Sequence, residues 1–290
     1  MPATRIESQN AAAFLASLDV SGDLWAPFET GRWVFRGHAN AAWALTPTAL
    51  RQNQRLSFKD PTVRGPLDNN AQIQAEEELL SEFVAFSDEL AFSLPGDLSS
   101  FLFPWAQHEA GPVVLDTPWP PVALLQLAAI AQHHGVPTRL LDFSFNPLVA
   151  AYFAACDACE QADALAIWAV DIVFVYRAWA PFQPGVRPVQ VPRGPNPFLH
   201  AQSGLFLYDA EDSRTPVDDR ILARDLALAD HLDQSEKDSL SKSDRVRVLT
   251  LPSSEREALI ALLARRRVTR AHLQPTLDNV VRELKARWSP

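Results

Sequence analysis

The stretch from His133 to Ala155 constrains the fold more than any other part of this sequence, because it sets polar side chains inside an apolar run. Seven polar residues fall within fourteen positions: His133, His134, Thr138, Arg139, Asp142, Ser144 and Asn146. Burying a polar or charged group without a partner costs on the order of several kcal/mol. The chain must therefore pair these groups with one another or aim them into a cleft.

The first half of this stretch predicts a helix followed by a short strand. Residues Leu124–His134 have a helical apolar pattern, and the glycine that follows is typical of a helix C-terminus. Pro137 disfavours further helix, so Arg139–Phe143 is predicted to be a buried strand. Arg139 and Asp142 are predicted to form a buried ion pair, because a lone buried charge would be costly.

The second half predicts a polar turn and a central helix. Asn146 before Pro147 is a typical helix start, with asparagine as the N-cap and proline in the first turn. The helix Leu148–Cys159 is rich in alanine and strongly apolar, which favours a buried position. Ser144 lies at the strand-to-helix turn, where a side chain is easily aimed into a cleft.

The remaining segments predict a mixture of strands and helices without internal repeats. Strands are predicted at Arg32–Arg36, Ala164–Val175, His200–Tyr208 and Arg245–Leu251. Helices are predicted at Ala11–Leu18, Glu76–Phe92, Ser253–Arg265 and His272–Trp288. Loops or surface insertions are predicted at Gln52–Asn70, Pro181–Pro197 and Glu211–Asp244.

The composition, 47% hydrophobic and 21% charged, is that of a globular protein that can bury a sizeable core. A net charge of −9 argues against wholesale binding of nucleic acid or membranes, but it leaves room for a local basic patch such as Arg265–Arg267 with Arg270. Cys156 and Cys159 lie one helical turn apart without a second pair, so we expect neither a structural zinc site nor a disulfide framework. Without a signal peptide or a membrane-spanning apolar run, a cytoplasmic protein is expected.

Three separated motifs resemble the FRG domain family, which is named after a Phe-Arg-Gly sequence. The first is Phe35-Arg36-Gly37, the second is the run from His133 to Ser144 (HHGVPTRLLDFS), and the third is Ala201–Phe206 (AQSGLF). The resemblance covers most of the chain, from about Trp33 to Leu284. It implies kinship of fold with that family rather than a particular reaction.

The chain is also similar, more distantly, to arginine-type ADP-ribosyltransferases. These begin with an aromatic-Arg-Gly strand end, as at Phe35-Arg36-Gly37, and continue with a Ser-centred strand that leads into a helix, as at Asp142–Phe153. The similarity implies an α+β fold, an ADP-ribosyltransferase-like split β-sandwich with inserted and flanking helices. It implies one domain over residues 1–290, with a core at about 30–252, a helical insertion at about 71–134 and C-terminal helices at about 253–288.

The same similarity implies NAD as a co-substrate and suggests roles for the site residues. Arg36 would clamp the NAD diphosphate, and Gly37 would let the backbone reach the nicotinamide amide. Ser144 would hold the ribose or orient Gln202. Gln202 stands where the transferases carry a catalytic glutamate, so the catalytic set implied is Arg36, Ser144 and Gln202. The cofactor-binding set implied is Arg36, Gly37, His38, His133 and Asn146.

These residues also have ordinary structural explanations. Arg36 taken alone is typical of a salt bridge, and a glutamine in a strand, as Gln202 is predicted to be, is usually a satisfied core amide. His133 and its neighbour end a helix, where the helix dipole favours imidazolium. Asp209 and Glu211 lie near Gln202 in sequence and are reserve candidates for a catalytic acid.

The leading hypothesis is an NAD-dependent ADP-ribosyltransferase that modifies a macromolecule in a bacterial toxin or phage-defence setting. The acceptor, nucleic acid or protein, stays open, and a toxin would imply an antitoxin partner. The alternative is a non-catalytic module that binds a nucleotide or a partner in the same cleft. A third hypothesis, a nucleic-acid-processing hydrolase, is disfavoured by the acidic balance and the lack of clustered carboxylates.

Overall fold

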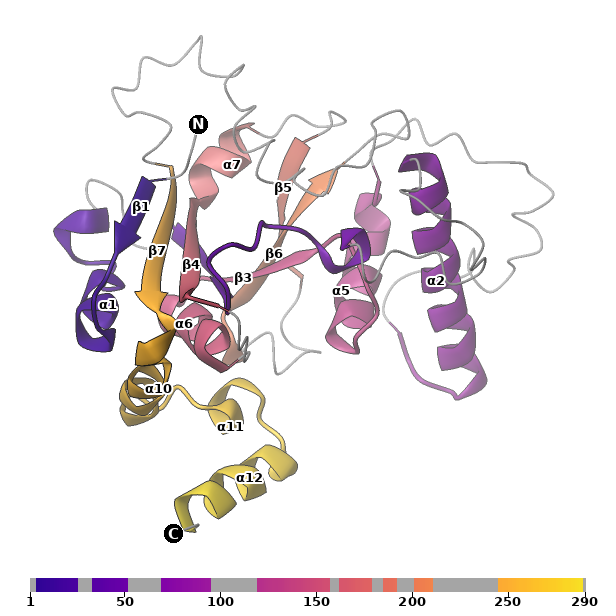
Figure 1. The fold of residues 1–290 in the computed structure, drawn as a ribbon. Coiled ribbons are helices and arrows are strands. Elements are labelled where there is room, and N and C mark those ends of the chain that lie inside the picture. The colour runs from indigo at the N-terminus through magenta and orange to yellow at the C-terminus, as the bar shows by residue number, and fades with distance from the viewer. Residues whose placement is uncertain are drawn as a thin grey trace.

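A seven-stranded mixed sheet organises the chain, with helices packed on its faces (Figure 1). The structure is a computed structural model that describes residues 4–25, 33–51, 69–94, 119–156, 162–178, 185–191, 201–210 and 245–288. The strands are β1 (Thr4–Glu7), β2 (Trp33–His38), β3 (Leu141–Ser144), β4 (Ala164–Asp171), β5 (Gly185–Val189), β6 (Gly204–Ala210) and β7 (Val246–Pro252). This architecture confirms the expected α+β class.

The helices of the described residues lie on both sides of the sheet and beyond its ends. The α-helices are α1 (Ala11–Ser17), α2 (Asn69–Glu89), α5 (Leu125–His133), α6 (Pro147–Cys156), α7 (Ile172–Ala178), α10 (Arg256–Arg265), α11 (Arg270–Leu273) and α12 (Leu277–Trp288). Short 3-10 helices occur at Asp23–Trp25, Thr48–Leu50, Val122–Leu124 and Ser253–Glu255. None of these helices is long and apolar enough to cross a membrane.

The sheet is nearly divided between two of its central strands. Its order is β1-β7-β4-β2-β3-β6-β5, in which β1 and β7 are parallel and the other neighbours are antiparallel. Strand β2 pairs with β4 along its whole length, from Trp33 to His38. On its other side, β2 meets β3 in the single register pair Phe35 and Ser144. Beyond that pair the two strands diverge, which leaves room for side chains between them.

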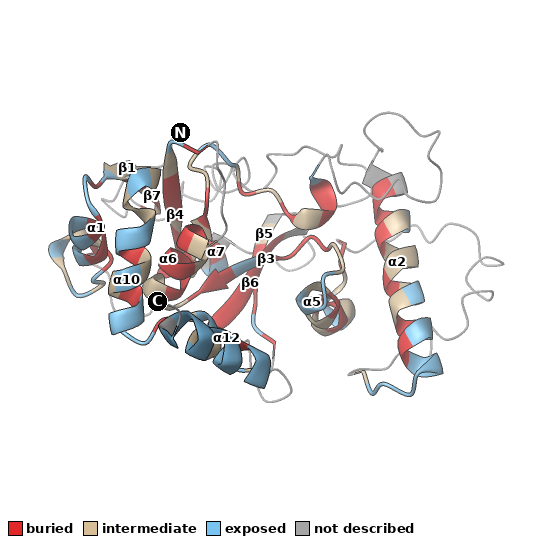
Figure 2. Cartoon of the chain, turned by 60° about the horizontal axis from the view of Figure 1, so that its bottom comes forward, coloured by how far each residue is buried: buried red, intermediate tan, exposed pale blue. Residues whose placement is uncertain are grey.

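The main core lies on the face of the sheet that is covered by α1, α6 and α10 (Figure 2). Helix α6 is apolar and rich in alanine, so it packs closely against β2 and is buried along most of its length. Phe35 projects from β2 into this core, and Leu165 and Ile167 project from β4. On the opposite face, Val34 of β2 packs in a second cluster with residues of β3, β4, β6 and α7. Because these strands are buried on both faces, their sequences are continuously apolar rather than alternating.

Helix α5 packs against β5 and β6 on one side, with Leu125 and Ala128 next to Phe206. On its other side it packs against α2, with a core around Leu80, Trp119 and Leu127 (Figures 1 and 2). A buried ion pair ties α2 to the segment that leads into β3. The Arg139 Nε donates to both carboxylate oxygens of Glu76 at 2.8 Å, and both side chains are almost fully buried. The predicted pairing of Arg139 with Asp142 is therefore wrong, because a helix far away in sequence supplies the carboxylate.

Two predicted boundaries are also corrected. The strand expected at Ala164–Val175 ends at Asp171, whose Oδ1 accepts hydrogen bonds from the backbone N–H groups of Val173 and Phe174 and so starts α7. The loop expected at Pro181–Pro197 contains β5, although Pro188 lies within it. An edge strand tolerates proline because one side of its backbone has no partner strand.

Gln202 was predicted to lie inside a strand, and this is wrong as well. Strand β6 begins at Gly204, so Gln202 lies in the turn that precedes it. Most of the loop expected at Gln52–Asn70 and the insertion expected at Glu211–Asp244 lie outside the described residues, as does Cys159. The helices expected around the central motif are confirmed as α5 and α6, with β3 between them.

Candidate functional site

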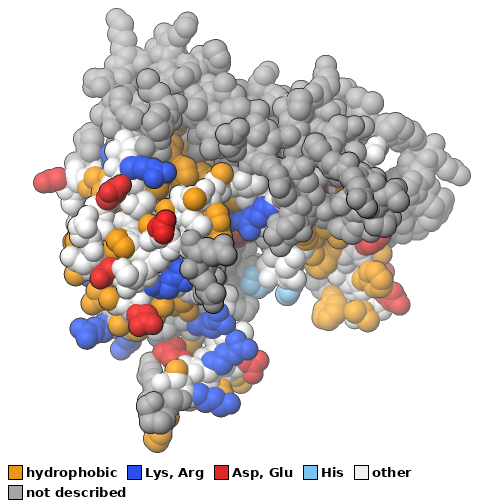
Figure 3. Space-filling view, in the orientation of Figure 1, with side chains coloured by type: hydrophobic (Ala, Val, Ile, Leu, Met, Phe, Trp, Pro, Cys, Tyr) orange, Lys and Arg blue, Asp and Glu red, His pale blue; other side chains and the backbone are white. Residues whose placement is uncertain are grey.

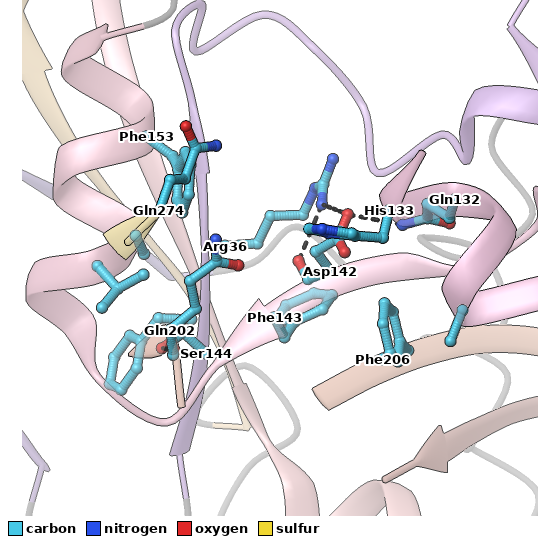
Figure 4. Close-up of a pocket in the computed structure, with 15 residues that line it drawn as sticks. Arg36, Gln132, His133, Asp142, Phe143, Ser144, Phe153, Gln202, Phe206 and Gln274 are labelled. Atoms are coloured by element: carbon cyan, nitrogen blue, oxygen red, sulfur yellow. Dashed lines mark hydrogen bonds and ion pairs between the residues drawn. The ribbon is translucent and has the colours of Figure 1, made fainter. Parts of the chain in front are cut away.

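A cleft of about 290 Å³ lies where β2 and β3 diverge (Figure 4). Its walls come from Phe35–Gly37 of β2, from Asp142–Ser144 of β3, and from the facing sides of α5 and α6. Gln202 in the turn before β6 and Gln274 after α11 complete the wall. The near-division of the sheet thus creates the cleft, and segments distant in the sequence line it.

Arg36 bridges the gap between the two diverging strands. Its Nη1 donates to the backbone carbonyl of Asp142 at 2.8 Å and lies 3.7 Å from that residue's carboxylate. Its Nε donates to Nε2 of His38 at 3.2 Å. The guanidinium is only 15% exposed at the side-chain level, yet it lines the cleft. Arg36 therefore connects the two halves of the sheet and at the same time presents a positive charge to the cleft.

His38 is buried behind Arg36 and does not line the cleft. Burial, followed by the neighbouring Arg36 charge, lowers the pKa of His38 to about 3. The imidazole is therefore neutral at pH 7, and its Nε2 can accept the hydrogen bond from Arg36 only if its proton sits on Nδ1. The structure places His38 as a support for Arg36, whereas the sequence resemblance suggested direct cofactor contact.

Gly37 lines the cleft, and its lack of a side chain is required by the helix packed against it. A Cβ atom at this position would lie 2.0 Å from the carbonyl oxygen of Ala150 and 2.7 Å from the backbone nitrogen of Ala154. No side chain fits into that space. The glycine thus allows α6 to approach β2, which brings the helix to the edge of the cleft.

Ser144 and Gln202 form a hydrogen-bonded junction at one end of the cleft. The Ser144 hydroxyl donates to the backbone carbonyl of Gln202 at 2.6 Å and accepts from the backbone N–H of Asn146 at 2.9 Å. The Gln202 side chain donates from Nε2 to the carbonyl of Leu273 at 3.2 Å. Asn146 caps α6 by accepting from the N–H of Leu148, and it does not line the cleft. Ser144 therefore links the end of β3 to the turn that contains Gln202.

Asp142 is a cleft residue that the sequence-based site assignment missed. Its side chain is 64% exposed, and it is the only carboxylate among the described residues that line the cleft. Its Oδ2 accepts a hydrogen bond from Nε2 of Gln132 on α5 at 2.7 Å (Figure 4). The alternation of a strand could have revealed it, because residues two apart, Asp142 and Ser144, share a face.

The cleft also contains aromatic surface and a histidine. The rings of Phe143, Phe153 and Phe206 contribute to its walls, each from a different element (Figure 4). His133 lies in the last turn of α5, where desolvation and then the neighbouring His134 lower its pKa, while Asp142 acts in the opposite direction. Phe143 and Phe206 are almost fully buried, so only the partly buried Phe153 ring could pack against an aromatic ligand here.

Two groups of candidates remain: a possible metal site and the reserve acids near Gln202. No group of three or more His, Cys, Asp or Glu side chains that could hold a metal ion occurs in them. Glu211 lies outside the described residues, and the side chain of Asp209 does as well.

Comparison with known proteins identifies one family. No curated protein and no solved structure matches the chain. The FRG domain matches residues 31–163, a range that contains the Phe35-Arg36-Gly37 motif and the whole run from His133 to Ser144. The Gln202 turn and the C-terminal helices lie beyond the match. Residues 31–163 of the chain are therefore similar to the FRG domain.

Proposed function

We propose that this cleft binds NAD and that the protein transfers ADP-ribose from NAD to a macromolecule. The observation that carries the proposal is the convergence of Arg36, Ser144 and Gln202 on one cleft. They come from motifs far apart in the sequence, and they lie on β2, on β3 and just before β6, three successive strands of the sheet. The resemblance to arginine-type ADP-ribosyltransferases implies this arrangement.

The form of the sheet supports the same proposal. A split β-sandwich is the fold that the resemblance implies, and the sheet here is held together between β2 and β3 by one register pair. We propose that the cleft at this junction corresponds to the NAD site of the transferases. The domain limits given above, a single domain over residues 1–290, belong to the same proposal.

The groups around the cleft suit the nicotinamide half of NAD. The Arg36 guanidinium offers planar donors to a phosphate, which a lysine could not copy. The partly buried Phe153 ring on α6 offers an apolar face to the nicotinamide. A volume of about 290 Å³ is near the lower end for small-molecule sites, so it suits the nicotinamide-ribose half, with the adenosine half extending along the surface.

The acceptor is a macromolecule in this proposal, and the surface beside the cleft is basic. Residues 256–288 contain eight Lys or Arg and three Asp or Glu, although the chain as a whole carries a net charge of −9. Lys and Arg side chains gather over the C-terminal helices (Figure 3). A positive surface attracts negatively charged partners. It therefore favours nucleic acid as the acceptor over a protein surface that has few acidic residues. A bacterial toxin or phage-defence role, with an antitoxin for a toxin, is part of the same proposal.

The test is incubation of the protein with labelled NAD and cell lysate. We expect nicotinamide release and a labelled macromolecule, and digestion with nuclease or protease then identifies the acceptor class. Arg36→Ala should abolish NAD binding and turnover, whereas Asp88→Asn, an exposed change on α2, should leave both unchanged. Absence of nicotinamide release by the wild type, with lysate present as acceptor source, would contradict the proposal.

A specific observation favours the alternative, a non-catalytic binding module. The Ser144 hydroxyl and the Gln202 amide are both engaged by the main chain, and neither carries a charge. Such a module would bind NAD or another nucleotide in a calorimeter and lose affinity in Arg36→Ala. It would release no nicotinamide under any condition, which separates it from the transferase.

A further inference from the structure

We propose that Asp142 is the catalytic carboxylate of the cleft, in place of the glutamate that the transferases carry and this chain replaces with Gln202. This inference rests on the proposed function. A reaction at the ribose C1′ of NAD develops positive charge and needs an acceptor for a proton. Gln202 has no charge and no basic atom for either task. Asp142 has both, and it is the only carboxylate lining the cleft among the described residues.

A chain of hydrogen bonds holds Asp142 in one orientation. The backbone N–H of Leu140 donates to the Thr138 hydroxyl oxygen at 3.2 Å. That hydroxyl in turn donates to Oε1 of Gln132. The Gln132 amide is thereby oriented with Nε2 toward Asp142, and it donates to Oδ2 at 2.7 Å. Gln132 is thus a positioning residue, fixed by α5 and by the turn before β3.

The position of Asp142 relative to Arg36 suits the connectivity of NAD. The carboxylate lies 3.7 Å from the guanidinium that we assign to the diphosphate. In NAD, the phosphate joins O5′ of the same ribose whose C1′ carries nicotinamide. Because we assign the nicotinamide-ribose half to the cleft, a carboxylate beside the phosphate-binding guanidinium lies within reach of this ribose. Its 64% exposure leaves it accessible from the open side of the cleft, where a macromolecular acceptor must enter.

The chemical step assigns each bond and proton. The acceptor's oxygen or nitrogen forms a bond to C1′ while the bond from C1′ to the nicotinamide nitrogen breaks. The electron pair of the broken bond goes to that nitrogen and cancels its positive charge. The acceptor's proton goes to the Asp142 carboxylate and from there to water. The same carboxylate stabilises the positive charge that develops on the ribose during this exchange of bonds.

The experiment compares Asp142→Asn, Asp142→Glu and the matched control Asp88→Asn, at an exposed residue of α2 outside the cleft. We expect kcat for nicotinamide release to fall by about 100-fold or more in Asp142→Asn. The Kd for NAD should not rise, because a negative charge near the diphosphate has been removed. Asp142→Glu should recover activity to within about tenfold of wild type, since the charge is restored at a shifted position.

Gln132→Ala provides a second readout. If Gln132 acts by orienting Asp142, kcat should fall by about tenfold, the equivalent of one hydrogen bond to a charged group, with KM for NAD unchanged. The change should add little when combined with Asp142→Asn, because the residue that Gln132 orients is then already inactive. A KM effect without a kcat effect would overturn the positioning role.

The outcomes separate this inference from the proposed function. An active wild type with Arg36→Ala inactive and Asp142→Asn fully active overturns the role of Asp142 alone. A large fall in melting temperature in Asp142→Asn also overturns it, because the loss would then be structural. An inactive wild type overturns the proposed function, and the role of Asp142 falls with it. Activity lost in Asp142→Asn at unchanged stability and NAD affinity supports the inference.

Discussion

At the scale of single residues, one buried carboxylate determines how α2 is attached. Glu76 is 5% exposed and receives Arg139, the indole N–H of Trp119 at 2.7 Å and the amide of Gln72 at 2.9 Å. All of these partners are buried with it. Removing one charge of such a pair leaves the other uncompensated in a low-dielectric environment, which is more costly than the net value of the pair.

Glu76→Gln should therefore lower the free energy of unfolding by about 3–5 kcal/mol. Glu89→Gln, the same substitution at an exposed position on α2, should change it by less than about 0.5 kcal/mol. Asp142→Asn should also be nearly neutral, since its carboxylate is exposed and is not the partner of Arg139. Urea titrations of the three variants check this. A larger loss in Asp142→Asn than in Glu76→Gln would contradict the assignment of the pair.

His38 should make the stability of the protein fall as the pH is lowered. Its pKa is about 3 in the folded protein and ordinarily 6.5, so between these values the unfolded chain binds a proton that the folded protein does not. Stability is therefore full above pH 6.5 and is lost progressively as the pH falls toward 3. From pH 7 to pH 5 this amounts to about 2 kcal/mol.

The check is to measure unfolding free energies at pH 7 and pH 5 for the wild type and His38→Gln. Glutamine keeps an acceptor for the Arg36 Nε but has no proton to gain, so the variant should lose about 2 kcal/mol less than the wild type over this interval. Gln74→Ala, an exposed change on α2 that removes no titratable group, serves as the control and should show the wild-type pH dependence. Equal pH dependence in all three proteins would contradict the buried neutral state of His38.

At this scale, the sequence indicates which side chains need a partner. It does not indicate equally well which residue the partner is. The polar run around Asp142 predicts buried pairs and a cleft, and both occur. The partner of Arg139 is Glu76, however, 63 positions away on a helix whose docking depends on the tertiary fold. Local spacing therefore favoured Asp142, which is nearby in sequence but points to the cleft. The cleft partners Gln132 and Asp142 became visible only once α5 and β3 were placed together.

At the scale of elements, the close approach of α6 to β2 depends on Gly37. Gly37→Ala should destabilise the protein by about 3 kcal/mol or more, because its Cβ would meet backbone atoms, which cannot move aside as a side chain can. Gly135→Ala is the matched control. It has open space around it but a φ of +93°, so only backbone strain of about 1 kcal/mol is expected. Thermal and urea unfolding should rank the two in this order, and equal losses would contradict the packing argument.

Elements were predictable where the chain's own pattern determines them. Helices α5 and α6, with Gly135 and Asn146 at their ends, follow from capping signals that act locally. The strand boundary at Asp171 was missed because the apolar residues around it fit a strand and a helix equally well. In the structure, the Asp171 carboxylate accepts hydrogen bonds from Arg245 and from the first turn of α7, and this ends the strand. The edge strand β5 was missed because proline argues against strands, an argument that fails at a sheet edge.

At the scale of the whole molecule, the cleft is closed by the C-terminal segment as well as by the sheet. Leu273 accepts the hydrogen bond from Gln202, and Gln274 lines the cleft. Val268 and Leu273 are also buried in the main core. Helix α12, in contrast, presents apolar side chains to solvent, with Leu277 84% exposed and Trp288 86% exposed. The segment between Arg267 and Gln274 is therefore integral to the fold, while α12 contributes little to its core.

Two truncations of the chain test this division. A chain that ends after Gln274 loses α12 and the hydrogen bond between Thr269 and Glu283, so its unfolding free energy should fall by about 1 kcal/mol. A chain that ends after Arg267 also loses buried Val268 and Leu273, and should lose about 4 kcal/mol or more. It loses the anchor of Gln202 as well, so its cleft should no longer bind NAD if the proposed function holds. Urea titration and calorimetry on both truncations provide the measurement. If the two truncations were equally destabilising, α12 would have to be the main source of the lost stability. The chain that ends after Gln274 keeps Val268, Leu273 and the cleft wall, so its loss would come from α12 alone.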